Sequence, residues 1–121
     1  MRKTTFAAIA LVLAASTASN PVFAQMKRVR ASAAEQARLV EAVKQHLKDP
    51  YSAVISDVRT YKTQMNIYAC GLVNAKNSFG GYTGSVPFHA GSLSLPGQTF
   101  ATPPIVLIGD AAQSNFARDC L

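Results

Sequence analysis

Two histidines are the side chains best suited to metal binding or proton transfer in this chain of 121 residues. His46 stands in a stretch with helical periodicity, and His89 follows a stretch that alternates like a strand. Neither has a second histidine, a cysteine or a carboxylate at the spacing that metal ligands usually show. We therefore expect no metal site and no cofactor.

Three further residues are candidates for catalysis. Ser78 precedes a glycine pair, but no base stands near it in a recognisable motif. Asp57 and Asp110 are single carboxylates beside expected strands, and only folding could bring them together as an acid and base pair. The sequence thus does not indicate an enzyme, although a small hydrolase of envelope polymers stays open as an alternative.

The segment 70–88, CGLVNAKNSFGGYTGSVPF, differs from the rest of the chain in its clustered asparagine, glycine and aromatic residues. Asparagine side chains accept hydrogen bonds in turns and tolerate left-handed backbone. One interpretation is a hairpin whose polar side chains satisfy its own backbone. The other is a polar and aromatic patch that binds a glycan or a peptide. The candidate binding residues are Asn74, Lys76, Asn77 and Tyr82.

Cys70 and Cys120 are the two cysteines of the chain. An even number of cysteines in an exported protein indicates a disulfide, and two cysteines allow one intramolecular pairing. Their wide spacing lacks the local CxxC pattern of thiol oxidoreductases. We expect a structural Cys70–Cys120 disulfide bond.

Residues 1–24 have the features of a cleavable secretory signal. A basic start precedes a short apolar run at 6–15, and small residues come just before position 25. A membrane-spanning helix needs about 20 apolar residues, so the run is too short to span, and an uncleaved amphipathic anchor is the alternative. We expect cleavage after Ala24, no transmembrane segment in the remaining chain, and a periplasmic or secreted location in a Gram-negative bacterium.

The remaining chain is expected to begin with a basic, flexible leader at 25–31. Loss of the two basic residues of the signal lowers the net charge from +6 to +4. The leader is either a solvated terminus or an arm that meets anionic lipid headgroups, cell-wall polymers or nucleic acid. Because aromatic and basic side chains do not interleave here, we expect no nucleic-acid partner.

A single α+β domain at 32–121 is expected to position the candidate residues. Ser32 and Glu35 match a capping box, which predicts a helix over 33–48 that ends before an Asp-Pro pair. The apolar stripe of this helix contains Ala37, Val40, Val43 and Leu47, with Leu39 at its margin.

Four stretches predict the strands of an antiparallel sheet, and they lie at 53–61, 65–73, 79–88 and 105–108. Residues 111–117 predict a helical turn or two that leads to the second cysteine. The expected architecture has two layers: an N-terminal helix packed on a three- to four-stranded antiparallel sheet, with a short C-terminal helix and one disulfide.

The block CGLVNAKNSFGGYTG at 70–84, with the lead-in LKDPYSA at 47–53, resembles a group of small exported proteobacterial proteins, many of them lipoproteins. The resemblance covers roughly residues 40–90. The family has no established activity, so the resemblance implies export but no function. This chain departs from the family in lacking a lipid-attachment cysteine, and the stretch 91–104 does not match.

These features favour an exported, non-enzymatic binding or interaction protein of the bacterial periplasm or cell envelope. Its expected partner is an envelope or secreted protein, or a cell-wall glycan. The alternatives are the hydrolase and an inhibitor of a host or competitor enzyme. A hollow lined by Asn74, Asn77 and Tyr82 would favour a small ligand, whereas an exposed apolar patch around them would favour a protein.

Overall fold

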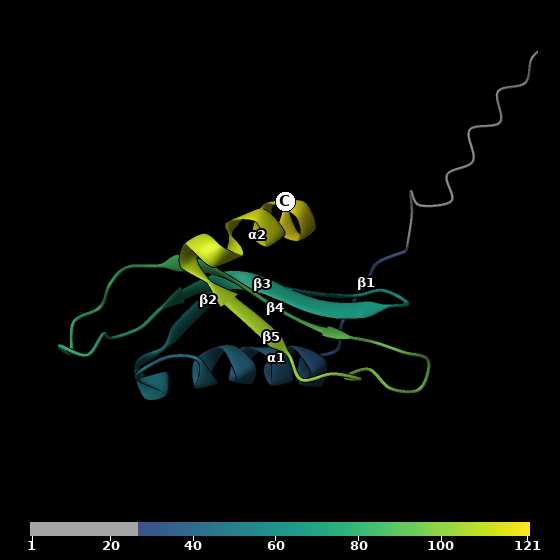
Figure 1. The fold of residues 1–121 in the computed structure, drawn as a ribbon, viewed down its shortest axis with the longest axis horizontal. Helices are drawn as coiled ribbons and strands as arrows, with labels where there is room; N and C mark the ends of the chain where they lie inside the picture. Colours follow the sequence, from purple (N-terminus) through teal and green to yellow (C-terminus); the bar gives the residue numbers. More distant parts are fainter. Residues whose placement is uncertain (1–26) are drawn as a thin grey trace, which may run out of the picture.

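A five-stranded antiparallel sheet lies between two helices in the computed structural model, which describes residues 27–121 (Figure 1). The strands follow one another in chain order, and each neighbouring pair is antiparallel. The α+β class is confirmed, but the sheet has five strands instead of three or four. The strands are β1 (Val29–Arg30), β2 (Val54–Lys62), β3 (Asn66–Asn74), β4 (Val86–Leu93) and β5 (Ile105–Ile108).

The additional strand comes from the basic leader. In β1, Val29 pairs with Lys62 and Arg30 pairs with Tyr61, at the end of β2. Two residues are too few to show an alternating pattern, so the sequence did not indicate this strand. Residues 25–26 of the leader and the expected signal at 1–24 lie outside the described residues.

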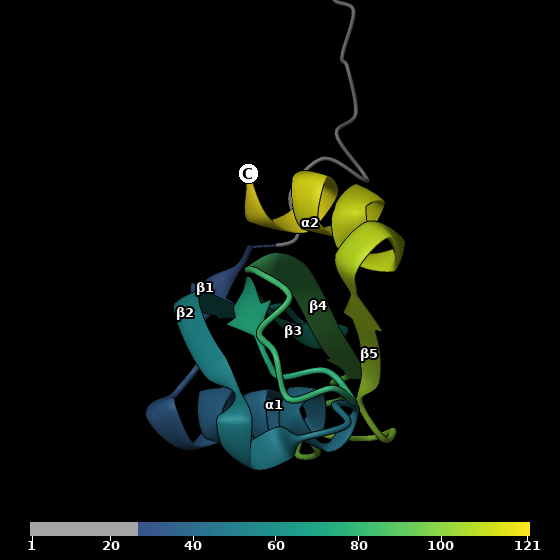
Figure 2. The same ribbon diagram turned by 90° about the vertical axis from the view of Figure 1, so that its left-hand side faces the viewer.

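The two helices cover opposite faces of the sheet (Figure 2). Helix α1 (Ala33–Gln45) packs on one face, and helix α2 (Gln113–Cys120) packs on the other after the short 3₁₀ helix η2 (Gly109–Ala112). The central strand β3 is therefore buried on both of its faces. The expected two layers are in fact three.

Helix α1 begins as the sequence predicts. The backbone N–H of Glu35 donates to Ser32 Oγ at 3.2 Å, and the backbone N–H of Ser32 donates to Glu35 Oε2 at 2.8 Å. The helix ends at Gln45 instead of residue 48, because the chain turns there into the 3₁₀ helix η1 (Pro50–Ser52). Leu39, placed at the margin of the stripe by the sequence, is completely buried.

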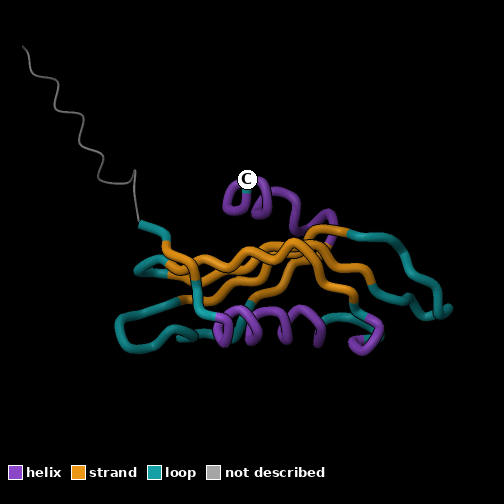
Figure 3. The backbone as a smooth tube through the Cα atoms, turned by 180° about the vertical axis from the view of Figure 1, so that it is seen from behind, coloured by secondary structure: helices purple, strands orange, loops and turns teal. Residues whose placement is uncertain are grey.

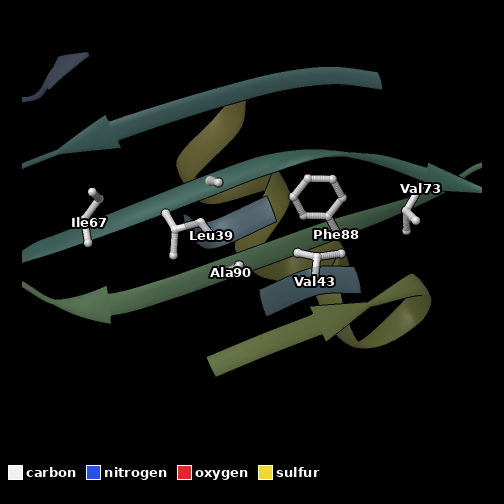
Figure 4. Packing of buried hydrophobic residues seen from close by; sticks show 7 residues of the cluster. Leu39, Val43, Ile67, Val73, Phe88 and Ala90 are labelled. Atoms are coloured by element: carbon white, nitrogen blue, oxygen red, sulfur yellow. The ribbon is translucent and has the colours of Figure 1, made fainter. Parts of the chain in front are cut away.

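The core between α1 and the sheet is built around Phe88 on β4 (Figure 4). Its ring lies over Gly71 on β3, where an added Cβ would approach Phe88 Cε1 to 2.7 Å. Gly71 therefore leaves the space that the ring occupies. Leu39 and Val43 of α1 fill the layer above the strands, and both are fully buried.

The expected strand at 79–88 is wrong for most of its length. Pairing of β3 with β4 starts at Val73 and Val86 and continues to Leu93, so residues 75–85 form a loop. Gly80 and Gly84 have φ angles of +79° and +96°, which a regular strand does not contain. The strand β4 instead continues past the expected end at residue 88 to Leu93.

Candidate functional site

The loop between β3 and β4, residues 75–85, projects beyond one end of the sheet (Figure 3). It carries three of the four candidate residues, and Asn74 is the last residue of β3 at its base. We call residues 75–85 the projecting loop. The structure therefore brings all four candidate residues to one end of the molecule.

The two asparagines use their side chains to organise this loop. Asn77 Oδ1 accepts hydrogen bonds from the backbone N–H groups of Phe79 at 2.9 Å and Gly81 at 3.2 Å. Asn74 Oδ1 accepts from the backbone N–H of Gly84 at 3.1 Å. These are the turn-forming contacts typical of asparagine. Of the two interpretations of this segment, the structural one describes Asn74 and Asn77.

The projecting loop is also tied to η1. The backbone N–H of Lys76 donates to Ser52 Oγ at 2.9 Å, and the Tyr82 hydroxyl donates to the Ser52 carbonyl at 3.1 Å. Lys48 Nζ donates to Ser78 Oγ at 2.9 Å. Lys76 and Tyr82 also face each other as an isolated β-bridge. The loop is thus held in place by hydrogen bonds although most of it is exposed.

Aromatic side chains stand free at this end of the molecule. Phe79 is 97% exposed and Tyr51, in the neighbouring η1, is 101% exposed, while Tyr82 is about half exposed. We call these three residues the aromatic tip. Of the three, only Tyr82 was selected from the sequence. Their positions in the sequence could have indicated their exposure: Phe79 lies inside an asparagine-glycine turn, and Tyr51 directly follows a helix-ending proline.

Two lysines flank the aromatic tip. The ammonium nitrogen of Lys76 lies 5.6 Å from the centre of the Tyr82 ring, and that of Lys48 contacts the Ser78 hydroxyl. Within residues 27–121, neither lysine forms an ion pair with a carboxylate. Their positive charges are therefore available to a partner.

Of the three residues of the aromatic tip, Tyr51 borders one of the main hollows over residues 27–121. None of these main hollows is lined by Asn74, Asn77 or Tyr82. A cavity of about 430 Å³ between the end of α1 and η1 includes Tyr51 in its wall. The candidate residues themselves do not enclose a small ligand.

A second polar cluster, which sequence reasoning missed, lies under α2. His89 Nε2 and Asp119 Oδ2 are 2.9 Å apart, and the His89 ring stacks on Tyr68 with 5.8 Å between ring centres. The hydrogen bond from the Arg118 guanidinium is the main cause that lowers the pKa of Asp119, and the contact with His89 lowers it further. His89 and Asp119 are far apart in the sequence, so only the fold reveals the pair.

This cluster holds α2 against the sheet. Cys70 and Cys120 beside it are joined in the expected disulfide, with their Cα atoms 6.2 Å apart and both residues buried. Arg28 donates to the Asp119 carbonyl at 2.8 Å and Arg59 to the Cys120 carbonyl at 3.0 Å. These bonds satisfy carbonyl groups that the helix end leaves free.

The remaining candidates for chemistry stay separate. His46 caps the end of α1, with its Nδ1 2.9 Å from the Ala42 carbonyl. Asp57 is exposed on β2, and Asp110 is exposed in η2 after β5, with two strands between β2 and β5. No group of three or more metal-binding side chains occurs among residues 27–121.

Comparison with family models, curated proteins and solved structures finds no match to this chain. The resemblance to small exported proteobacterial proteins therefore stays a prediction. The helices within residues 27–121 include none that is long and apolar enough to cross a membrane.

Proposed function

We propose that this chain is an exported binding protein of the bacterial periplasm or cell envelope, which engages its partner through the aromatic tip. The observation that carries the proposal is the 97% exposure of Phe79 on a loop that its own hydrogen bonds hold in place. A large apolar side chain gains about 1.5–3 kcal/mol on burial. Because folding leaves the Phe79 side chain exposed, this free energy of burial is available when a partner covers the ring.

The hydrogen bonds of the projecting loop support the same function. Binding costs less free energy when the contacting segment is already ordered, because fewer conformations are lost. Asn77 orders the turn that carries Phe79, and Ser52 anchors the base of the loop. In this proposal the asparagines position the aromatic tip, whereas Phe79, Tyr82 and Lys76 meet the partner.

The absence of the candidate residues from the walls of the main hollows over residues 27–121 favours a macromolecular partner over a small ligand. Small-molecule sites are concave and enclose most of the ligand surface, and the candidate residues do not line such a hollow. Exposed aromatic side chains are typical of surfaces that bind other large molecules. A partner in the envelope fits the expected secretory signal at 1–24 and the Cys70–Cys120 disulfide, since disulfides persist in oxidising compartments.

The proposal is tested by sedimentation of the purified protein with isolated envelope material. Phe79→Ala should weaken the association about tenfold or more, because central aromatic contacts carry more than ~1 kcal/mol of binding. Met65→Ala is the matched control, since Met65 is 58% exposed in the turn before β3, at the other end of the sheet. Equal binding by the wild-type protein and Phe79→Ala would refute the proposal.

A further inference from the structure

We propose that the partner of the aromatic tip is an anionic phospholipid bilayer, into whose interface Phe79 inserts. This inference rests on the proposed function and goes beyond it by naming the partner. It predicts reversible, peripheral attachment by one loop.

The order of residues along the projecting loop places Phe79 foremost. Lys76 and Tyr82 form the bridge at the base of the turn. Beyond them the Asn77 N–H donates to the Gly81 carbonyl at 2.9 Å, which closes the turn with Phe79 at its middle. The Phe79 ring thus lies at the apex of the loop, and Tyr82 and Lys76 lie nearer its base. Amphipathic tyrosine rings sit at headgroup level in membrane proteins, and lysine ammonium groups reach the interface from apolar surroundings.

Backbone donors at the apex of the loop have their partners within the loop itself. The N–H groups of Phe79 and Gly81 donate to Asn77 Oδ1, and the N–H of Gly80 donates to the Asn77 carbonyl at 3.0 Å. Three successive backbone donors are thus satisfied within the loop. A backbone donor without a partner is costly in lipid, where water cannot satisfy it.

Charge complementarity supports an anionic surface. Lys48 and Lys76 flank the aromatic tip, and neither forms an ion pair within residues 27–121. Basic residues next to an anionic leaflet are attracted by its surface potential within about a Debye length. The same lysines would lie beside lipid phosphates when Phe79 enters the interface.

A bilayer also fits the shape of the tip better than a protein does. Phe79 and Tyr51 are almost completely exposed and come from two different segments, so they have little packing against their own chain. A protein partner would need a separate pocket for each ring. A fluid lipid interface accepts exposed aromatic rings from separate segments without such preformed pockets.

Tryptophan fluorescence tests this inference directly, because the chain contains no tryptophan. Phe79→Trp places one fluorophore at the apex, and Met65→Trp places one at the opposite end of the sheet as a control. The full protein is mixed with phosphatidylcholine vesicles that contain about one third phosphatidylglycerol, an anionic lipid. We expect a blue shift of the emission of the Phe79→Trp variant and its quenching by brominated acyl chains, with neither effect in the Met65→Trp variant.

Removal of charge tests whether the anionic lipid surface attracts the loop. In the Phe79→Trp background, Lys76→Ala should weaken vesicle binding about fivefold, because a lysine near an anionic surface adds ~1 kcal/mol. Arg30→Ala is the control, since it removes one positive charge from β1 at the other end of the molecule. Binding should also be weaker with phosphatidylcholine alone and at higher salt.

Two results would overturn the bilayer as partner: an unchanged emission of the Phe79→Trp variant with the anionic vesicles, or equal quenching of the fluorophores at positions 79 and 65. If envelope material still retains the wild-type protein and loses the Phe79→Ala variant, the proposed function stands with a protein or glycan partner. If Phe79→Ala binds envelope material as the wild type does, the proposed function fails as well.

Discussion

Gly80, Gly81 and Gly84 lie in one loop but in different backbone conformations. Gly80 and Gly84 have positive φ angles, whereas Gly81 does not, and an added Cβ would meet no atom within 4 Å at any of the three. A side chain at these positions would therefore be disfavoured by backbone conformation at Gly80 and Gly84, and at none of them by lack of space. In the sequence, all three read as glycines of an expected strand.

Gly84→Ala should lower the free energy of unfolding by about 1–2 kcal/mol, because a Cβ is disfavoured in left-handed backbone. Gly81→Ala is the matched control and should change it by no more than about 0.5 kcal/mol. Urea denaturation of both variants measures the difference. Equal losses would show that the φ angle of Gly84 does not determine its tolerance.

Single-residue reasoning selected the projecting loop and, with Lys76 and Tyr82, two of the three side chains that we propose to meet the partner. Asn74 and Asn77 were chosen as binding residues, and the structure uses them to bond the loop backbone. Phe79 and Tyr51 were not chosen, because exposure of an aromatic ring depends on whether the fold covers it. Periodicity cannot show this for a residue in a turn.

At the scale of elements, helix α2 is fastened to the sheet by several contacts at its C-terminal end. The Cys70–Cys120 disulfide joins it to β3, and the contact between His89 and Asp119 joins it to β4. Arg28 and Arg59 donate to its last carbonyl groups. These contacts join α2 to four other parts of the chain: the leader, β2, β3 and β4.

Replacement of both cysteines by alanine should destabilise the protein by up to ~4 kcal/mol, the loop-entropy value for a disulfide of this span. The bonded residues are 50 positions apart. Hydrogen exchange should show the loss first in α2, while β3 stays protected by its two neighbouring strands. Unchanged protection of α2 in the double variant would contradict the account of how this helix is held.

The contacts of Asp119 predict how stability depends on pH. The Arg118 hydrogen bond is the main cause that lowers the pKa of Asp119 in the folded protein. The stabilisation is therefore complete above the ordinary aspartate pKa of about 4 and is lost as the pH falls through the lower folded value. Asp119→Asn should therefore reduce the loss of folding stability at acid pH, when the free energy of unfolding is measured from pH 7 downward. An identical pH profile for the two proteins would refute the assignment.

Elements with local signals were predicted well, and elements that depend on distant pairing were not. The capping box located the start of α1, and alternation located β2 and β3 to within a residue or two. The expected start of β4 was wrong, because the glycines at 80–84 belong to the projecting loop, whose shape comes from hydrogen bonds of Asn74 and Asn77 and from bonds to η1. The placement of α2 on the second face depends on a disulfide partner in β3, and local sequence does not specify a face.

At the scale of the whole molecule, the two ends of the sheet differ. The projecting loop and η1 form one end, and β1 with the turn between β2 and β3 forms the other (Figure 1). The basic leader thus enters the domain away from the aromatic tip. Attachment through the tip would leave the leader and the far end of the sheet free.

Export makes a separate prediction for the whole chain. Protein recovered from the periplasm should begin at Gln25, because small residues precede that position after a short apolar run. Intact-mass analysis measures the start directly. A mass that still includes Met1 to Ala24 would show that the signal is not cleaved there.

Site-specific photo-crosslinking tests the central claim most directly, namely that the aromatic tip is the recognition surface. A photoreactive phenylalanine analogue is placed at position 79 and, in a second protein, at position 65 at the other end of the sheet. Both positions are exposed, so neither change should disturb the core. We expect abundant adducts with envelope lipid or another envelope macromolecule from position 79 and few from position 65. Equal yields at the two positions, or adducts from position 65 alone, would contradict the claim.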